Sequence, residues 1–452
     1  MADDVLPDNW QWTTLGEVAD PSSRAIVSGP FGSNIGSRFF VKGGVPVIRG
    51  NNLTTDMRRF IDDGFVFVTE EKADELRNCD AVVDDLIFTA AGSLGQVGLI
   101  PKAAKYPRYI ISNKQLRARL DKTKADPLFA FYWFASKEMV EYVQQRNTGS
   151  SVPLINLSVL RSLPLPLPPL PEQRAIAHIL GTLDNKIELN RLMKETLEAI
   201  VRAVFRSWFV DFEPVRGKAE RREPGLPKEI ADLFPQGFEE SEVGEIPAGW
   251  RVGAFGELVE LVRDQENPLD SPDAVFSHYS IPAFDEGQTP TTECGENIKS
   301  LKFRIPAGAV LLSKLNPEIE RVWLVDVRLE ERAVCSTEFL VLRPRTPFAR
   351  TYVYCLARSA LFRQQIEGLV TGTSKSHQRA QAESILSLSV VVPAPSIVQA
   401  FERFSAGVLA RTLTCRRESE TLAFLRDTFL PKLISGELRV KIAQRISAEG
   451  GA

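Results

Sequence analysis

Two long stretches of the chain carry apolar residues in alternating steps of four and three, the spacing of a coiled-coil helix. The first stretch extends from Pro168 to Phe212 and contains neither glycine nor proline from Thr182 onward. Its apolar positions are Ile176, Leu180, Leu183, Ile187, Leu197, Val201, Val204 and Trp208, and the polar residues Asn190 and Lys194 interrupt them. A helix of about 40 residues would be roughly 60 Å long, and a single apolar stripe of that length needs a partner surface.

The pattern returns near the C-terminus, where Pro393-Ala394-Pro395 precedes a second stretch that continues to Leu438. The triplet Glu195-Thr196-Leu197 recurs as Glu420-Thr421-Leu422, displaced by 225 residues (420 − 195). Two stripes of similar length can bury each other as an antiparallel pair, in which Asn190, Lys194, Arg416 and Arg426 would fix the register. The alternative is that each helix packs across its own domain.

A shorter alternation of β-rich runs and turns precedes each long stretch. The first set is Val45–Arg49, Leu86–Thr89, Val97–Ile100 and Tyr109–Ile111, followed by a helical stretch over 128–145. The second set is Val310–Ser313, Trp323–Val325 and Phe339–Leu342, followed by a helical stretch over 348–367. The openings also match, because Trp10 and Leu15-Gly16-Glu17 return as Trp250 and Phe255-Gly256-Glu257. The chain therefore contains an internal repeat of a globular half and a long helix.

We predict an α+β fold with two mixed α/β domains related by this repeat and separated by two long helices that form an antiparallel coiled coil. The predicted segments are a globular domain over 1–167, a long helix over 168–212, a connector over 213–246, a second globular domain over 247–392, a second long helix over 393–440 and a tail over 441–452. The connector is rich in proline, glycine and charge,. The predicted elements are repeated, whereas the sequences between the matching motifs differ. This pattern suits a protein in which each half recognises a different part of a two-part target.

Composition restricts the class of protein. The formal net charge is −3 and the five cysteines are scattered, so neither a disulfide framework nor a zinc site is indicated. No window approaches 18 uninterrupted apolar residues, and the acidic start carries no signal peptide, so we expect a cytoplasmic protein. The charge argues against a tight nucleic-acid binder acting alone, although basic residues can still gather on one face.

Five motifs resemble the hallmarks of the specificity subunits of type I restriction–modification enzymes. They are Gly29-Pro30-Phe31-Gly32-Ser33-Asn34, Pro169-Leu170-Pro171-Glu172-Gln173-Arg174, Trp208-Phe209-Val210-Asp211-Phe212-Glu213-Pro214, Gly244-Glu245-Ile246-Pro247-Ala248-Gly249-Trp250 and Leu433-Ile434-Ser435-Gly436-Glu437-Leu438. The resemblance extends over essentially the whole chain. The second copy departs from the pattern at Pro395-Ser396-Ile397-Val398-Gln399, which lacks Glu-Gln-Arg and leaves the start of its helix less defined.

The resemblance implies two target-recognition domains that read the halves of a split, asymmetric sequence in double-stranded DNA. It also implies two methylation subunits around the helices and restriction/translocase subunits for cleavage. S-adenosylmethionine, ATP and Mg would belong to those partners, and the methylation subunit would flip an adenine out of the duplex. A related system of the type IIB or IIG kind would use the same sort of subunit.

Side chains that read bases are hydrogen-bonding groups on loops. The candidates in the first half are Ser33, Asn34, Arg49, Asn51, Asn52, Ser93, Lys114, Gln115, Thr148 and Ser150. Those in the second half are Tyr279, Lys314, Asn316, Thr373, Lys375, His377 and Arg379. The alternative for each polar loop residue is simple solvation.

Motifs for catalysis are missing from the sequence. An adenine methyltransferase needs an Asn/Asp-Pro-Pro-aromatic pocket, and the nearest string, Asn316-Pro317-Glu318-Ile319, lacks the second proline and the aromatic residue. No Walker motif or paired-carboxylate nuclease cluster is present. We therefore predict a non-catalytic DNA-recognition subunit without a metal site. A methyltransferase and a coiled-coil scaffold that does not bind DNA are the competing interpretations.

Overall fold

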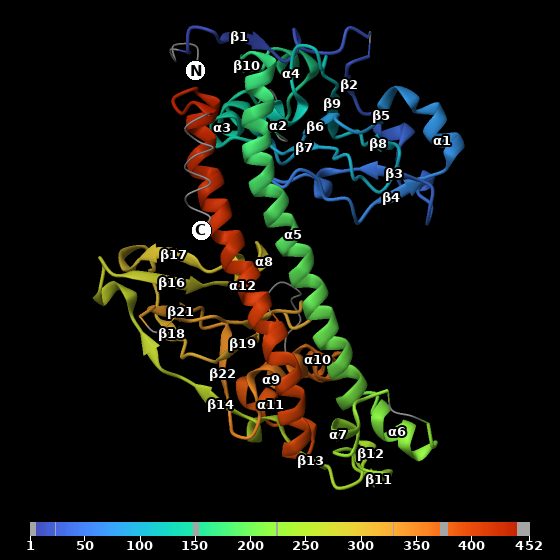
Figure 1. The fold of residues 1–452 in the computed structure, drawn as a ribbon, viewed down its shortest axis with the longest axis vertical. Coiled ribbons are helices and arrows are strands. Elements are labelled where there is room, and N and C mark those ends of the chain that lie inside the picture. The colour runs from blue at the N-terminus through green and yellow to red at the C-terminus, as the bar shows by residue number, and fades with distance from the viewer. Residues whose placement is uncertain are drawn as a thin grey trace. The chain divides into compact units, whose positions relative to one another are not determined.

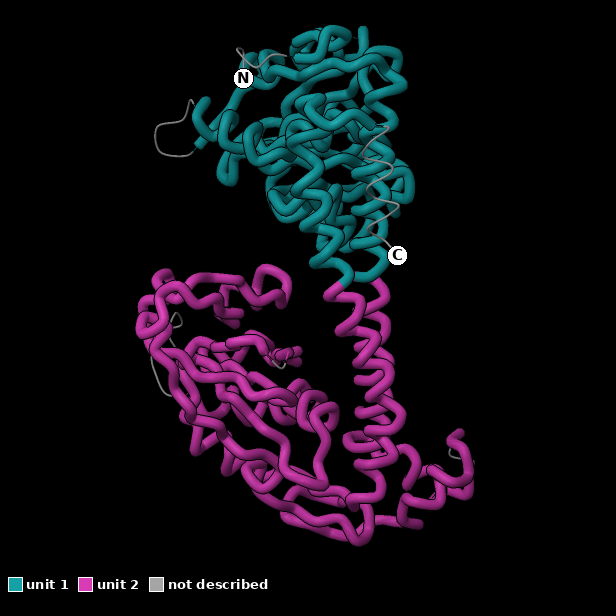
Figure 2. The backbone as a smooth tube through the Cα atoms, turned by 60° about the vertical axis from the view of Figure 1, so that its left-hand side comes forward, with its two compact units in different colours: residues 1–190, 418–452 teal, residues 191–417 magenta. Residues whose placement is uncertain are grey.

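The computed structural model describes residues 6–22, 24–147, 153–222, 225–328, 330–370 and 378–440. The chain divides into two compact units, shown in Figure 2. Unit 1 consists of residues 1–190 and 418–452, and unit 2 consists of residues 191–417. The two long helices, α5 (Leu170–Phe209) and α12 (Pro395–Ile434), each contribute residues to both units (Figure 1).

Unit 1 contains two four-stranded sheets and one short strand pair. The first sheet has the order β2-β9-β6-β7 and is antiparallel throughout; its strands are Ile26–Ser28, Gln115–Ala118, Leu86–Thr89 and Val97–Leu99. The second has the order β4-β3-β8-β5, with strands Val66–Val68, Val45–Ile48, Tyr109–Ile111 and Asp80–Ala81. Strands β3 and β8 are parallel. Strand β1 (Gln11–Thr14) pairs with β10 (Pro164–Leu167), which leads directly into α5.

Unit 2 repeats this arrangement with different loops. Its antiparallel sheet has the order β14-β22-β19-β20, with strands Val259–Val262, Phe339–Pro344, Val310–Ser313 and Val322–Leu324. Its second sheet has the order β15-β18-β21-β16-β17, with strands Gln265–Glu266, Lys302–Arg304, Ala333–Cys335, Val275–Tyr279 and Thr291–Cys294. Strands β16 and β21 form the parallel pair, and β13 (Arg251–Ala254) pairs with β23 (Ser389–Val392). The predicted internal repeat is therefore present in the strand pairing.

The helix predicted over 128–145 is divided into two. Asp126 begins α2 (Pro127–Phe134) by accepting hydrogen bonds from the amides of Leu128 and Phe129. Ser136 then begins α3 (Lys137–Gln145) by accepting one from the amide of Met139. In unit 2, Ser359 caps α10 (Ala360–Gly368) in the same way, directly after α9 (Arg350–Arg358). A serine with an extended backbone therefore separates the two helices of each pair and caps the second one. The spacing of apolar residues does not reveal this break.

The remaining short helices lie in the loops and in the segment predicted as a connector. They are α1 (Glu70–Glu75) and α4 (Leu157–Arg161) in unit 1, and α8 (Ile281–Asp285) and α11 (Ala382–Leu386) in unit 2. The connector forms α6 (Glu213–Ala219), α7 (Lys228–Ala231) and a hairpin of β11 (Phe238–Ser241) and β12 (Gly244–Pro247). Phe234 and Ile246 are buried in the core of unit 2, so this segment is packed against the domain rather than extended.

Within each unit, the parts of α5 and α12 pack together in opposite directions. In unit 1, Asn190 donates a hydrogen bond to Glu418 over 2.9 Å, and Arg426 donates to Asp184 over 2.9 Å. In unit 2, Val201 and Phe205 of α5 join Phe401 and Leu409 of α12 in one core. The predicted mixed fold with two long, antiparallel helices is confirmed, and polar pairs at the predicted Asn190 and Arg426 mark the register.

Candidate nucleic-acid interface

Four loops meet at one end of the sheets in unit 1. They follow β2, β3, β6 and β8, and short hydrogen bonds join them. The amide of Gly29 donates to Gln115 O over 2.9 Å, Ser112 N donates to Ile48 O over 2.9 Å, and Ala90 N donates to Lys114 O over 2.7 Å. Gln96 Nε2 donates to Leu53 O over 3.1 Å. We call this group of loops, residues 29–34, 49–53, 90–96 and 112–115, the unit 1 loop end.

Six of the predicted DNA-contact residues lie together at the unit 1 loop end. Ser33, Asn34, Asn51, Ser93 and Lys114 are exposed, and Arg49 is half-buried. Backbone contacts orient two of them, since Arg49 Nη2 and Asn51 Nδ2 each lie 3.4 Å from Gly64 O. The exposed residues of this group form one surface. Their positions in the sequence, from 33 to 114, did not indicate that they would lie together.

A glycine allows the first loop to approach the last. A Cβ atom on Gly29 would lie 1.8 Å from Ser112 O, closer than any side chain can come. Beyond it, Phe31 is 85% exposed, and this aromatic residue was absent from the predicted contacts. The turn sequence Gly-Pro-Phe-Gly could have indicated this exposed ring, because residues in a tight surface turn are usually kept out of the core.

Two predicted contacts at this end are buried instead. Asn52 is fully buried; its Oδ1 accepts from Arg49 N over 2.9 Å, and its Nδ2 donates to Ile61 O over 3.0 Å and Asp63 O over 2.8 Å. Gln115 is 1% exposed, and its Oε1 accepts a hydrogen bond from Ser112 Oγ. These amides satisfy buried backbone and side-chain groups, so neither can reach a base edge, and we leave both out of the proposed surface.

The pair Asn51 and Asn52 gives a test of this distinction. Asn52→Ala is expected to lower the free energy of unfolding by about 2–3 kcal/mol, because it removes the three hydrogen bonds that the buried Asn52 side chain forms with Arg49 N, Ile61 O and Asp63 O,. Asn51→Ala is expected to change it by less than about 0.5 kcal/mol, as for other exposed positions. Urea unfolding of the two variants, followed by tryptophan fluorescence, measures the difference. Equal decreases in the free energy of unfolding for the two variants would show that the hydrogen bonds of Asn52 do not stabilise the fold.

Unit 2 presents an equivalent end. The amide of Ala380 donates to Lys314 O over 3.0 Å, and Asn316 N donates to Gln378 O over 2.8 Å. The guanidinium of Arg379 forms two hydrogen bonds with Glu338, of 2.8 and 3.0 Å. Strand pairing also matches, because Ala91 bridges Leu154 in unit 1 and Leu315 bridges Arg379 in unit 2. We call residues 313–321, 336–338 and 378–380 the unit 2 loop end.

Asn316 occupies a special backbone position at the unit 2 loop end. Its φ is +47°, a conformation in which asparagine is tolerated and most residues are strained,. Gly92, one residue past the matching bridge in unit 1, has a φ of +98°. Among the described residues, nothing hydrogen-bonds to the buried Oδ1 of Asn316. The unit 2 loop end therefore contains a buried acceptor that no described residue satisfies.

Tyr279 does not belong to this surface. It is 2% exposed, its ring centroid lies 4.7 Å from that of Trp323, and burial raises the pKa of its hydroxyl. The ring packs against Trp323 of β20, a strand of the other sheet in unit 2, rather than facing solvent,. The predicted contacts Thr148, Ser150, Thr373, Lys375 and His377 lie outside the described residues.

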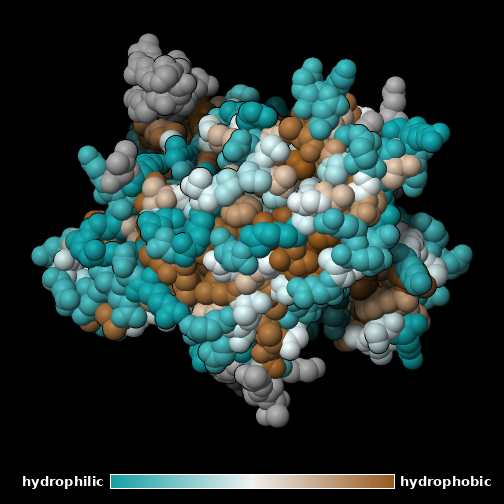
Figure 3. Space-filling model, turned by 90° about the horizontal axis from the view of Figure 1, so that it is seen from below, coloured by the Kyte–Doolittle hydropathy of each residue, from teal (hydrophilic) through white to brown (hydrophobic). Residues whose placement is uncertain are grey.

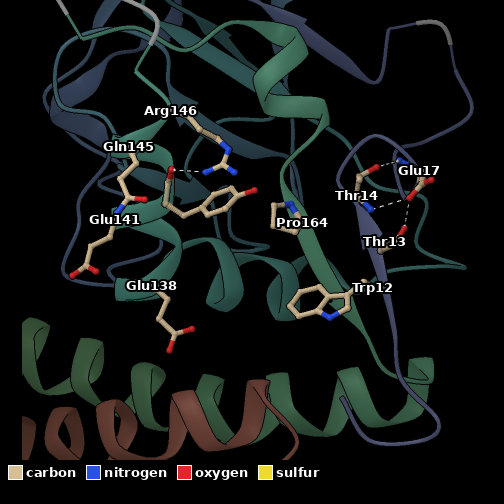
Figure 4. A pocket seen from close by; sticks show the side chains of 10 residues that line it. Trp12, Thr13, Thr14, Glu17, Glu138, Glu141, Gln145, Arg146 and Pro164 are labelled. Carbon is tan, nitrogen blue, oxygen red and sulfur yellow. Dashed lines mark hydrogen bonds between the residues drawn. The ribbon is translucent and has the colours of Figure 1, made fainter. Parts of the chain in front are cut away.

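A separate pocket of about 880 Å³ in unit 1 has the wrong charge for a DNA surface (Figure 4). Glu138 and Glu141 of α3 line it, together with Glu17. The Glu17 carboxylate accepts hydrogen bonds from Thr13 Oγ1 over 2.8 Å and Thr14 N over 2.9 Å, which keeps the pKa of Glu17 below its ordinary value. Carboxylates repel phosphates, so we do not include this pocket in the interface.

The sequence matches a model of the type I restriction modification DNA specificity domain over residues 7–199. Residues 7–199 therefore carry this DNA specificity domain. The chain is a DNA specificity subunit of a restriction–modification system, and it is non-catalytic. The predicted family, function and lack of catalysis are confirmed.

Two specificity subunits from other organisms align with nearly the whole chain or most of it. The type I restriction enzyme MjaIX specificity subunit of Methanocaldococcus jannaschii is 23% identical over 96% of this chain and 95% of its own length. The HindI specificity subunit of Haemophilus influenzae is 25% identical over 73% of this chain and 81% of its own length. The crystal structure of an S subunit from M. genitalium covers 95% of this chain and 97% of its own, with a TM-score of 0.56 and 15% identity. That structure shares the fold of this specificity subunit.

No group of three or more histidine, cysteine, aspartate or glutamate side chains in the described part of the specificity subunit could hold a metal ion. Among the same residues, no helix combines the length and the apolar character needed to cross a bilayer.

Proposed function

We propose that each loop end reads one half of a bipartite, asymmetric DNA sequence, and that partner subunits methylate adenine and cleave DNA according to that reading. The observation that supports this proposal is the repeated strand order with unlike loops. The loops carry different residues: Asn34, Asn51 and Lys114 follow β2, β3 and β8 in unit 1. In unit 2, Lys314 and Asn316 follow β19, the counterpart of β6, and Arg379 pairs with Leu315 beside them. Equivalent scaffolds with different donors and acceptors suit two different half-sites.

The residues at the unit 1 loop end divide into two kinds of contact. Asparagine side chains present a donor and an acceptor together, the pattern that pairs with the major-groove edge of adenine. Lys114 supplies a positive charge without directional pairing, which suits a phosphate. Phe31 supplies an exposed apolar ring that can contact a thymine methyl group. We propose Ser33, Asn34, Arg49, Asn51, Ser93 and Lys114 as the unit 1 contacts, with Phe31 added.

Partner subunits are proposed to cover the outer faces of the long helices. Large apolar side chains are exposed there, with Leu189 at 51% and Phe424 at 71% in unit 1, and Leu192 at 47% and Ile200 at 43% in unit 2. Apolar patches among polar residues also appear on the face shown in Figure 3. Patches of this kind mark protein interfaces. We propose two methylation subunits here, joined by restriction/translocase subunits, in a complex that works on cytoplasmic DNA.

The test compares two substitutions in the complex with the methylation subunit and S-adenosylmethionine. Asn34→Ala is expected to weaken binding to the target by about 1–3 kcal/mol, roughly 5- to 150-fold, while binding to unrelated DNA stays unchanged. Lys114→Ala is expected to weaken binding to both DNAs and to reduce the salt dependence by about one counterion. Mobility shifts over a range of salt concentrations measure both effects.

The control is Lys137→Glu, an exposed residue of α3 outside the unit 1 loop end. Its affinity for the target should match that of the unaltered chain. Full target affinity and selectivity in both Asn34→Ala and Lys114→Ala would contradict the assignment of this surface.

A further inference from the structure

A groove of about 700 Å³ in unit 1 is lined by α5 residues between Arg174 and Asn185. Arg174 and His178 line it from one face of the helix, since they are one turn apart,. Lys102 and Lys122 line it from the loops of the antiparallel sheet. We call this feature the α5 groove; four of its lining side chains are Lys or Arg, and it forms no part of the loop end.

Part of the charge in the α5 groove is already neutralised. Lys122 forms an ion pair with Asp84 over 2.6 Å. The carboxylate of Asp126 is directed at the amides of Leu128 and Phe129, each 3.0 Å away. Both acidic residues of the groove are directed at other groups, and neither forms an ion pair with Lys102 or Arg174.

Three side chains of the α5 groove remain available. Within the described residues, no hydrogen bond or ion pair engages the side chains of Lys102, Arg174 or His178, and all three are exposed. Lys102 and Arg174 carry full positive charges at neutral pH. The groove therefore offers an uncompensated positive surface with further donors beside it.

The strand directions place the α5 groove away from the unit 1 loop end. Strands β6, β7 and β9 are antiparallel neighbours. Residues 90–96 and 112–115 lie at one end of them, whereas Asp84, residues 99–103 and Lys122 lie at the other. A duplex seated on the loop end would have the domain between itself and the groove, so the groove serves a different anion.

The lining of the α5 groove favours an acidic protein segment over a nucleotide. The free donors are distributed along the groove instead of converging on one point, and successive helix turns separate Arg174 from His178 by about 6 Å. Its floor includes the apolar residues Pro101, Leu128 and Ala177, and none of its lining residues is Phe, Tyr or Trp. Base recognition relies on stacking, whereas an extended segment with apolar and acidic residues fits a charged rim and an apolar floor.

The corresponding strand end in unit 2 is closed. Leu324 ends β20 at the position where Leu99 ends β7. Arg416 donates to Leu324 O over 3.3 Å, and Arg417 forms an ion pair with Asp326 over 2.5 Å. At this strand end, Arg416 and Arg417 of unit 2 have partners among the described residues, whereas the side chains of Lys102 and Arg174 in unit 1 do not.

We propose that the α5 groove binds an acidic, extended segment of one methylation subunit, with Lys102 and Arg174 contacting its carboxylates. This inference rests on the proposed assembly with methylation subunits. It assigns to unit 1 a partner contact that unit 2 lacks, so the two copies of the methylation subunit are held unequally.

The test is the double reversal Lys102→Glu/Arg174→Glu in the full chain. The affinity for the purified methylation subunit, measured by calorimetry at about 0.1 M salt, is expected to fall about tenfold or more for one of two binding steps. The difference should shrink at about 0.5 M salt, where the Debye length is short. The matched control is Lys137→Glu/Arg161→Glu, which makes the same change of charge at two exposed positions of unit 1 outside the groove.

A second measurement identifies the occupant directly. A photo-crosslinking amino acid in place of Arg174, in the complex with methylation subunit and target DNA, is expected to label a methylation-subunit peptide rich in Asp and Glu. Unchanged affinity of the Lys102→Glu/Arg174→Glu variant, or crosslinks to DNA alone, would overturn the inference. Failure of the proposed function is separate, because it would appear as a lack of sequence-dependent DNA binding by the unaltered complex.

Discussion

Replacement of Asp184 by alanine is expected to lower the free energy of unfolding of unit 1 by about 2–4 kcal/mol, because it removes the buried carboxylate that accepts from Arg426 and Tyr132 and leaves Arg426 with only the exposed carboxylate of Asp427,. Asp184 lies on α5, and its side chain is 9% exposed. One carboxylate oxygen accepts from Tyr132 Oη over 2.5 Å, and the other accepts from Arg426 Nη1 over 2.9 Å. Arg426, on α12, is 10% exposed.

Asp184 therefore joins three elements of unit 1. Tyr132 belongs to α2, and its hydroxyl also accepts from Arg59 Nη2 over 3.2 Å. Arg59 continues the network to α5 through Gly181 O and Asn185 Oδ1, each 3.0 Å away. The loss of one carboxylate would weaken the attachment of the sheet domain to α5 and of α5 to α12 together.

Chemical denaturation of the full chain measures the Asp184→Ala effect, since unit 1 contains its own tryptophans, Trp10, Trp12 and Trp133. Glu75→Ala is the control within the same unit. It removes the partner of Lys72 in an ion pair of 2.6 Å whose carboxylate is 65% exposed, and the expected loss is less than about 1 kcal/mol. A loss below about 1 kcal/mol for Asp184→Ala would show that the buried pair does not hold the helices.

Exchange of residues 26–118 for the equivalent block of another specificity subunit is expected to change one half of the methylated sequence and leave the other half unchanged. This block contains β2 to β9 and the whole unit 1 loop end. It leaves in place β1, β10, α2 and both long helices. Leu86, Phe88 and Leu116 of the block pack in the same core as these elements, so the donor block should be apolar at these positions. The sheet can therefore be replaced as a body while its support is kept.

Sequencing of methylated adenines in host DNA measures the outcome of the exchange. The donor block should retain an arginine at position 59, because this side chain bonds to Gly181 O on α5. The reciprocal control exchanges residues 259–342 in unit 2 and should change only the other half. Alteration of both halves by either exchange would show that the two loop ends do not read independently.

Local signals along the chain were sufficient for the elements that repeat. The β-rich runs at Leu86–Thr89, Tyr109–Ile111 and Val310–Ser313 form β6, β8 and β19 with the same bounds. Apolar periodicity predicts such elements because burial of one face repeats with the period of the backbone. Helix breaks at single serines were harder to predict. The caps at Ser136 and Ser359 divide two stretches that the apolar periodicity had predicted as continuous helices.

The candidate contacts show where local signals stop. Asn51 and Asn52 are neighbours of the same type, yet one is exposed and the other is fully buried among backbone groups of residues 49, 61 and 63. Tyr279 and Gln115 were equally plausible in sequence and are buried as well. Which side of a loop faces solvent depends on strands that pair across long separations, such as β3 with β8.

The sequence by itself determined that this protein has two related halves and two long helices, and its motifs identified the family. These features are encoded by repetition and periodicity, which can be read one segment at a time. Only the tertiary structure decided which polar residues share a surface, which of them are buried, and that a basic groove stays open beside α5 in unit 1. Those properties arise from contacts between residues far apart in the chain, where packing and charge pairing are resolved in three dimensions.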